Sequence, residues 1–408
     1  MPLPYPRAVT LNWRGLVPHL PLSPAEIRAG GLYVDRPYSG AAELERLLAS
    51  DSHKNIVLFG PAGSGKSTEL AMLAFRLHAN RSIVTAHIQI DRSRAFSQAV
   101  SPDDVLAAVR TLLIEELATT LDLSSAKGSW AHPSPLVDGQ DVAREGSTVT
   151  LRRVCLAASS IAGKGGLVVL LDGLEKANDL ARSVLAAFQG IPEARFVVVV
   201  PTTLGLAETE GRPTPKTSPG VRITTLQHQT KSIMATNSVE FVPVEPVLVN
   251  ASMEGHSGLR DLAEEGVRFL VRIAQQRLNC AGEHLDGSLD QMMRTAALLS
   301  GGLVRTFLQL LQDAANYAMM ADANVPSEGD FHQAAQDYAY ALCRLLLPGD
   351  VDALSTAHGT DGSSLEFERR VRLLDQGLLF QYRSAGNTVA IAPLLGLAIP
   401  ALQGVLNG

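Results

Sequence analysis

One strand–loop–helix segment near the N-terminal end constrains the fold of this chain more than any other feature. Asn55 to Phe59 is a largely apolar run of strand length, and a glycine-rich stretch, Gly60 to Ser67, follows it directly. The residues from there to Leu77 have helical periodicity. A strand that is apolar on both faces is typical of a parallel sheet covered by helices. The segment therefore predicts a buried strand, a tight loop and a helix of an α/β domain.

The loop has the pattern G-x-x-x-x-G-K-[ST], which predicts a phosphate site. Its residues are Gly60, Pro61, Ala62, Gly63, Ser64, Gly65, Lys66 and Ser67, with Thr68 next in the helix. Glycines let backbone N–H groups turn around phosphate oxygens, and the helix N-terminus adds its positive dipole end. Lys66 is expected to reach the β- and γ-phosphates and Ser67 to bind Mg²⁺. The pattern indicates a P-loop that binds ATP with Mg²⁺.

A second carboxylate for the metal is expected at the end of a neighbouring buried strand. Leu167 to Leu171 is such a strand, and Asp172 follows it. Asp172 is expected to hold Mg²⁺, and Glu175 to polarise the attacking water near the γ-phosphate. The alternatives are a strand-end turn for Asp172 and a solvent-facing helix cap for Glu175.

Short apolar runs alternate with helical segments as far as residue 249, which predicts a doubly wound α/β domain with a parallel sheet. The expected strands are 55–59, 83–90, 167–171, 196–200 and 239–249. The expected helices are 41–48, 67–77, 102–121 with Ser101 as its cap, 151–162 and 180–189. Two polar stretches, 124–147 and 208–237, are expected to be surface loops.

From residue 259 onward the pattern changes to helices alone, and the C-terminal end differs again. The expected helices are 259–278, 289–299, 303–317, 328–346, 350–357 and 365–375, the last ended by Gly377. Segments 378–383 and 388–392 flank Ser384 to Asn387 and are expected to form a β-hairpin. Helix, helix and hairpin together outline a winged helix. The predicted units are an irregular arm (1–30), a P-loop ATPase domain (31–250), a helical lid (251–325) and a winged-helix-like domain (326–408).

With these motifs in order, the chain resembles bacterial STAND-type and initiator-type (origin-recognition-like) AAA+ ATPases over roughly residues 30–395. Asp172 to Lys176 is similar to their Walker B segment, and Leu32 to Arg36 looks like the upstream segment that packs by the adenine. Phe196 to Thr203 looks like their sensor-1 strand. Ser300 to Leu311 looks like the lid segment with the sensor-2 arginine, here Arg305.

The resemblance implies roles that the residues alone leave open. Arg305 is expected to contact the nucleotide, but it could be a surface cation. Arg36 is expected beside the nucleotide, but it could pair with a carboxylate and only position the arm. Thr202 or Thr203 is expected to read the γ-phosphate, although either could simply cap a strand end.

The chain departs from the resembled proteins at its long loops and at the arginine finger. The candidates by position are Arg182, Arg195, Arg212 and Arg222. A finger acts across a subunit interface, so one sequence does not choose among them.

Two functions remain open from the sequence. The first is a regulatory ATPase whose nucleotide state controls self-assembly or a separate effector protein, as in bacterial antiviral defence or signalling. The second is a DNA-handling ATPase of initiator or transposition-regulator type. Its expected recognition helix carries Arg369, Arg370 and Arg372 but also Glu366, Glu368 and Asp375, which is unfavourable for phosphate contact. Salt-dependent binding to duplex DNA separates the two. A small-molecule kinase would give the lid and winged helix no purpose.

Composition bears on the possible partners of the protein and on its compartment. The 408 residues include 41 acidic and 35 basic side chains, so no global cationic field indicates nucleic acid. Cysteines are few and far apart, which suits a reducing compartment. The Pro-rich N-terminus does not have the apolar core of a secretory signal. The longest apolar stretch, 389–402, is broken by Pro and Gly and is shorter than a membrane span. We therefore expect a cytoplasmic protein with no membrane contact.

Overall fold

The computed structural model of the protein describes residues 13–16, 21–29, 31–37, 40–50, 55–79, 83–120, 146–162, 166–209, 239–249, 257–278, 287–382 and 388–407. The strands are β1 (Asn55–Phe59), β2 (Val84–Gln89), β3 (Leu167–Asp172), β4 (Ala194–Val199), β5 (Val239–Pro243), β6 (Leu379–Tyr382) and β7 (Thr388–Ile391). The helices before β5 are η1 (Trp13–Gly15), α1 (Pro24–Ala29), α2 (Ala41–Ser50), α3 (Lys66–His78), η2 (Ile90–Arg92), α4 (Arg94–Ser97), α5 (Pro102–Thr120), α6 (Ser147–Ala162), η4 (Leu174–Ala177), α7 (Asn178–Gln189) and α8 (Thr202–Thr209). The helices after it are α10 (Ser257–Arg277), α11 (Gly287–Leu299), α12 (Val304–Met320), α13 (Glu328–Cys343), α14 (Asp350–Ala357), α15 (Phe367–Asp375), α16 (Leu395–Ala398) and α17 (Pro400–Asn407).

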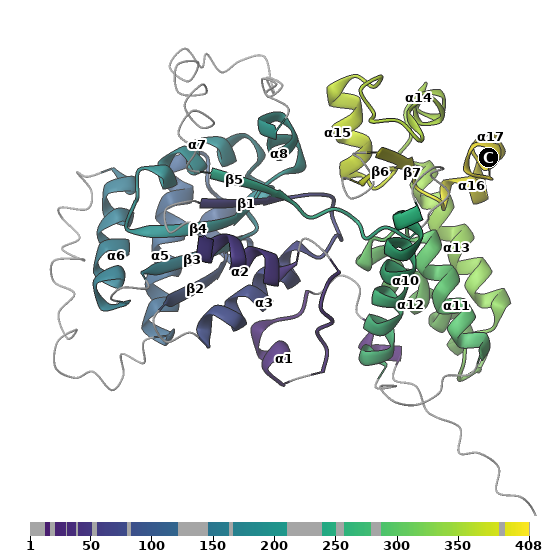
Figure 1. Ribbon diagram of the computed structural model, residues 1–408, viewed down its shortest axis with the longest axis horizontal. Coiled ribbons are helices and arrows are strands. Elements are labelled where there is room, and N and C mark those ends of the chain that lie inside the picture. Colours follow the sequence, from purple (N-terminus) through teal and green to yellow (C-terminus); the bar gives the residue numbers. More distant parts are fainter. Residues whose placement is uncertain are drawn as a thin grey trace, which may run out of the picture.

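The N-terminal half is built on a five-stranded sheet in the order β2-β3-β4-β1-β5. Every neighbouring pair in it is parallel. Successive side chains of a strand point to opposite faces, and both faces are buried here. Ile56 and Leu58 pack in one core with α2 and α3, whereas Val57 and Phe59 belong to the core that contains α5, α6 and α7 (Figure 1). The predicted doubly wound α/β fold is confirmed.

The predicted strands and helices of this half are present, and several differ in extent. Helix α6 begins at Ser147, earlier than the predicted start at 151. The pattern predicts a strand from 239 to 249, but β5 ends at Pro243 because Pro243 and Pro246 have no N–H group for a sheet hydrogen bond. The chain beyond it runs to the helical part, where the Val247 N–H donates to the Gly302 carbonyl at 3.1 Å. A loop is predicted from Glu208, but α8 continues to Thr209. Most of the two predicted loops lies outside the described residues.

The predicted irregular arm contains helix α1, which a capping box begins. The Ser23 hydroxyl accepts the Glu26 N–H at 3.2 Å, and the Glu26 carboxylate accepts the Ser23 N–H at 2.7 Å. Its residue Ile27 packs beside Ala71 of α3. Further upstream, the Trp13 indole donates to the Asn324 carbonyl at 3.0 Å beyond the end of α12. The arm therefore contacts both the sheet domain and the helical part.

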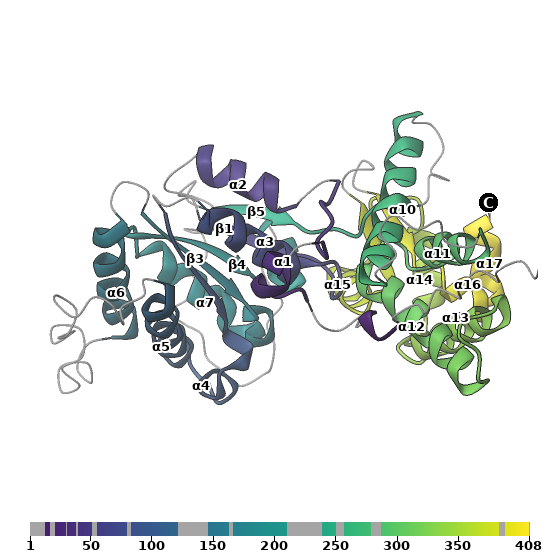
Figure 2. The ribbon, with the colours of Figure 1, turned by 90° about the horizontal axis from the view of Figure 1, so that it is seen from below.

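Helices α10 to α13 pack together beside the sheet domain, and the C-terminal unit stacks against both (Figures 1 and 2). That unit has α14, α15 and the antiparallel hairpin of β6 and β7, in the predicted order. Gly377, with φ of +68°, follows the end of α15 as predicted. The predicted hairpin turn lies outside the described residues. Helices α16 and α17 complete the unit, and among the described residues no helix is long and apolar enough to cross a membrane.

A buried acid holds the C-terminal unit together. Asp350 is fully buried, and both of its carboxylate oxygens accept hydrogen bonds from Arg372, at 2.6 and 2.8 Å. Arg369 lies 3.7 Å from the same carboxylate, which also accepts the Leu347 N–H at 2.6 Å. One side chain therefore joins the start of α14 to α15.

Replacing Asp350 with Ala is expected to reduce the free energy of unfolding by about 2 to 3 kcal/mol, because Arg372 and the Leu347 N–H lose their acceptor. Urea unfolding of the whole chain measures this. Asp352→Ala, an exposed acid on the same helix, is the matched control and is expected to change stability by less than about 0.5 kcal/mol. Equal stability of the two variants would contradict the role assigned to Asp350.

Candidate functional site

The glycine-rich loop lies between β1 and α3, at the carboxyl ends of the parallel strands. Gly60 and Gly63 have φ values of +146° and +85°, which L side chains rarely adopt. A Cβ at Gly60 would lie 2.3 Å from the Val244 carbonyl oxygen, and one at Gly63 would lie 2.7 Å from the Cβ of Arg305. The loop is therefore packed against the residue that follows β5 on one side and against α12 on the other, and both positions need glycine.

Lys66 begins α3 and is almost fully buried under the loop. Its ammonium group donates hydrogen bonds to the carbonyls of Gly60, at 2.7 Å, and Pro61, at 3.0 Å. Burial lowers the pKa of this group, while the carboxylates of Glu175 and Asp172 act in the opposite direction. The ammonium thus lies between the loop and two acids, where it can reach an anion in the pocket.

Asp172 ends β3 and is buried close to Ser67. Burial raises the pKa of Asp172, and the hydroxyl of Ser67 lowers it. One oxygen of the carboxylate, Oδ1, is buried and has no hydrogen-bond partner among the described residues. A buried carboxylate oxygen without a hydrogen-bond partner and a nearby hydroxyl are both hard oxygen donors, the kind of ligand that Mg²⁺ prefers. The two residues therefore fit Mg²⁺.

Glu175 lies in η4, one turn after Asp172, and its side chain lines the pocket with Lys66, whereas Asp172 lies outside the lining. Burial, and next the charge of Asp172, raises the pKa of Glu175. Its Oε2 atom is buried without a hydrogen-bond partner among the described residues. This placement favours the predicted base over the solvent-facing cap, because a raised pKa makes a carboxylate a better proton acceptor.

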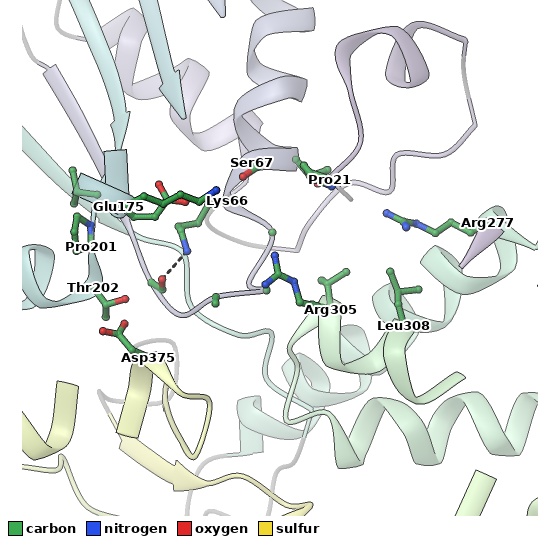
Figure 3. A pocket seen from close by; sticks show the side chains of 18 residues that line it. Pro21, Lys66, Ser67, Glu175, Pro201, Thr202, Arg277, Arg305, Leu308 and Asp375 are labelled. Carbon is green, nitrogen blue, oxygen red and sulfur yellow. Dashed lines mark hydrogen bonds between the residues drawn. The ribbon is translucent and has the colours of Figure 1, made fainter. Parts of the chain in front are cut away.

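Of the two predicted threonines, Thr202 lines the pocket and Thr203 does not. Thr202 is the first residue of α8, and its side chain lies next to that of Asp375 (Figure 3). Arg305 also lines the pocket, from the first turn of α12, and its backbone N–H donates to the Gly63 carbonyl at 3.2 Å. The helical part thereby contacts the loop through both backbone and side chain.

Arg36 lies outside the pocket lining, which differs from the expected position beside the nucleotide. Its buried guanidinium donates to the Ser64 carbonyl at 2.5 Å and to the Glu245 carbonyl. It also faces the buried carboxylate of Glu69, whose pKa burial raises and the charge of Arg36 lowers. Arg36 therefore supports the loop from behind, close to the alternative role in which it pairs with a carboxylate and positions the arm.

The pocket, of about 380 Å³, also contains residues that the sequence analysis missed (Figure 3). Pro21 comes from the arm, Arg277 from the end of α10, and Asp375 from the end of α15. Burial raises the pKa of Asp375, and the hydroxyl of Thr202 and the charge of Lys66 lower it. No local pattern distinguishes these residues, since all three reach the site from distant parts of the chain.

Two of the arginine-finger candidates have partners within the chain. Arg182 forms an ion pair with the buried Glu208, and Arg195 donates to the Leu48 carbonyl at 2.6 Å. Arg212 and Arg222 lie outside the described residues.

Comparison with known proteins supports the same fold. Residues 41–200 match the family described as AAA ATPase domain, so the chain carries such a domain. A sequence comparison with curated proteins gives no match. The Walker-type ATPase PABY2304 of Pyrococcus abyssi has a similar structure, with a TM-score of 0.50, 14% identity, and coverage of 92% of this chain and 96% of that one.

Two more solved structures are similar at lower scores. The ORC2 protein of Aeropyrum pernix, in ADPNP and ADP complexes, has a TM-score of 0.46 and 13% identity, covering 90% of this chain and 93% of that one. Cdc6p of Pyrobaculum aerophilum has a TM-score of 0.45 and 14% identity, covering 98% and 99%.

The two arginines near the loop are expected to respond differently to substitution. Arg36→Met should reduce the free energy of unfolding by about 3 kcal/mol, because two carbonyls lose their donor and Glu69 loses its counter-charge. Arg305→Met, at an exposed side chain, should change stability by less than about 0.5 kcal/mol but weaken nucleotide binding about tenfold. Urea unfolding and titration with a fluorescent adenine nucleotide measure the two effects. A stability loss confined to Arg305→Met would contradict these assignments.

Proposed function

We propose that the chain binds ATP with Mg²⁺ in this pocket and hydrolyses it, and that its nucleotide state controls self-assembly or a partner effector. One observation carries the hydrolysis: Lys66 and Glu175 line one pocket, the charge of Asp172 acts on Lys66 from beside it, and both acids have a buried oxygen without a hydrogen-bond partner among the described residues. Buried polar atoms in native proteins are rarely left unsatisfied without a functional reason. A magnesium nucleotide and an attacking water would satisfy both.

The proposed chemistry follows from the position of each side chain. The N–H groups of the loop and the ammonium of Lys66 hold the phosphate oxygens, and Ser67 and Asp172 hold the metal. Bound Mg²⁺ supplies neutralising charge between the phosphates. Glu175 accepts the proton of the attacking water, and Thr202 and Arg305 stabilise the negative charge that develops on the transferred group. Catalysis is then mainly positioning and charge neutralisation.

The regulatory part of the proposal is supported by where the pocket walls come from. The arm, the helical lid and the C-terminal unit each contribute a residue to a pocket whose floor is the P-loop domain. A ligand that contacts several units changes their relative stability by its differential affinity for each arrangement. The setting in bacterial antiviral defence or signalling is proposed on the sequence resemblance alone.

The DNA-handling alternative is less well supported by the surroundings of α15. Arg370 is buried, with its guanidinium 5.8 Å from the centre of the Phe367 ring. Arg372 and Arg369 neutralise the buried Asp350. Helix α15 also packs against α8 of the ATPase domain. These contacts engage the helix that would enter a major groove, and they favour an intramolecular role for the proposed winged helix.

Two substitutions are expected to separate nucleotide binding from hydrolysis. Lys66→Ala should abolish both, because the phosphates lose their buried cation. Glu175→Gln should keep ATP affinity within about threefold while reducing the hydrolysis rate at least about 100-fold, the usual contribution of a general base. Equilibrium ATP binding and phosphate release measure the two quantities.

Glu115→Gln, at an exposed acid on α5, is the matched control and should hydrolyse ATP at the wild-type rate. Wild-type hydrolysis by Glu175→Gln would remove this acid from the mechanism. Unchanged ATP binding by Lys66→Ala would show that ATP does not bind in this pocket.

The assembly switch predicts a nucleotide-dependent mass in solution. With ATP the wild-type chain should form a larger species than with ADP, and Lys66→Ala should stay at the smaller mass under both conditions. Light scattering with size-exclusion chromatography measures this. The same mass in all cases would contradict the assembly switch. Of the regulatory proposal, only the control of a partner effector would then remain.

A further inference from the structure

Asp375 is an acid from the C-terminal unit that lies inside the pocket of the ATPase domain. It ends α15, and its side chain lines the pocket together with Lys66 and Thr202 (Figure 3). The unit makes further contact nearby, where Leu374 and Gln381 share a small cleft with Phe59, Thr202 and Leu206. The acid is therefore brought to the pocket by the docking of a whole unit.

Two groups of the ATPase domain stabilise the charge of this carboxylate. The side chain of Thr202 lies beside it in the pocket (Figure 3), and the hydroxyl of Thr202 and the charge of Lys66 both lower the pKa of the acid. Under the proposed function these are two of the groups that serve a γ-phosphate: Lys66 holds its oxygens and Thr202 reads it. Asp375 thus lies in the pocket beside the groups that would serve the third phosphate of a nucleotide.

The C-terminal unit holds Asp375 firmly. The residues just before it, Leu373 and Leu374, are buried, and Arg372 on the same helix is hydrogen-bonded to both oxygens of Asp350. The Gly377 N–H donates to the Leu374 carbonyl at 3.1 Å and closes the helix end. The acid and the docked unit are expected to leave the pocket together.

Besides Lys66 and Asp375, the charged residues that line the pocket are Glu175, Lys176, Arg277 and Arg305. A diphosphate can use the loop N–H groups and leave the contact between Thr202 and Asp375 in place. A triphosphate brings further negative charge close to this acid and competes for Lys66 and Thr202. Like charges placed together repel each other.

We propose that Asp375 occupies the position of a γ-phosphate, so that the docked C-terminal unit selects nucleoside diphosphate and a bound triphosphate releases the unit. This inference rests on the proposed binding of adenine nucleotide in the pocket. It assigns the selectivity between the two nucleotides to one side chain of a distant unit, and it gives the proposed switch a physical contact.

The test compares the affinities of ADP and a non-hydrolysable ATP analogue, both with Mg²⁺, for the full chain by calorimetry. Wild type should bind ADP more tightly. Asp375→Asn and Asp375→Ala should each shift the affinity ratio about tenfold toward the triphosphate, because the like charge is gone. Glu368→Gln removes the same charge at an exposed position of the same helix, and its ratio should stay within about twofold of wild type.

The outcomes are distinct. Wild-type preference for the triphosphate, or an unchanged ratio in both Asp375 variants, would overturn the inference and leave the proposed function intact. A chain that binds neither nucleotide would instead overturn the proposed function. Asp375 is an exposed residue at the end of α15, so neither substitution is expected to impair folding, and thermal unfolding checks this.

Discussion

The backbone of the P-loop is held from three directions, and the rest of the site depends on that support. Arg36 donates to the Ser64 carbonyl from behind, the Arg305 N–H donates to the Gly63 carbonyl from α12, and the Val244 carbonyl leaves no room for a Cβ at Gly60. Because a phosphate site needs several N–H groups aimed at one point, a loop fixed in this way is pre-organised for its ligand. The same contacts tie the loop to parts of the chain far away in sequence.

These contacts make the pocket a junction between units. Its floor comes from the sheet domain, and its other walls come from the arm, α10, α12 and α15. A closed arrangement buries acids and cations that each have unfavourable desolvation, so its stability depends on which charges are present. A ligand that changes the charge at the pocket therefore changes how favourably the units pack. Fold and regulation rest on the same interactions.

Much of the fold and part of the site could be predicted from local sequence. Phe59 followed by Gly60 marks a strand end, and an acid after an apolar run marked Asp172, because both signals are local. Helix α1 was missed although Ser23 and Glu26 form a capping-box pattern. The support role of Arg36 depends on its contact with Glu245, and the position of Asp375 depends on the docking of a whole unit. Neither contact can be predicted from the residues that flank it in the sequence, because each is made with a distant part of the chain.

Hydrogen–deuterium exchange of the full chain tests this account most directly, with Mg²⁺ and either ADP or a non-hydrolysable ATP analogue. The amides of residues 60–68 and of the first turn of α12 should exchange more slowly with either nucleotide. The amides of α15 should stay protected with ADP and exchange faster with the triphosphate, because local protection reports the packing that holds a segment. Equal exchange of α15 under both nucleotides, or a P-loop that neither protects, would contradict the account.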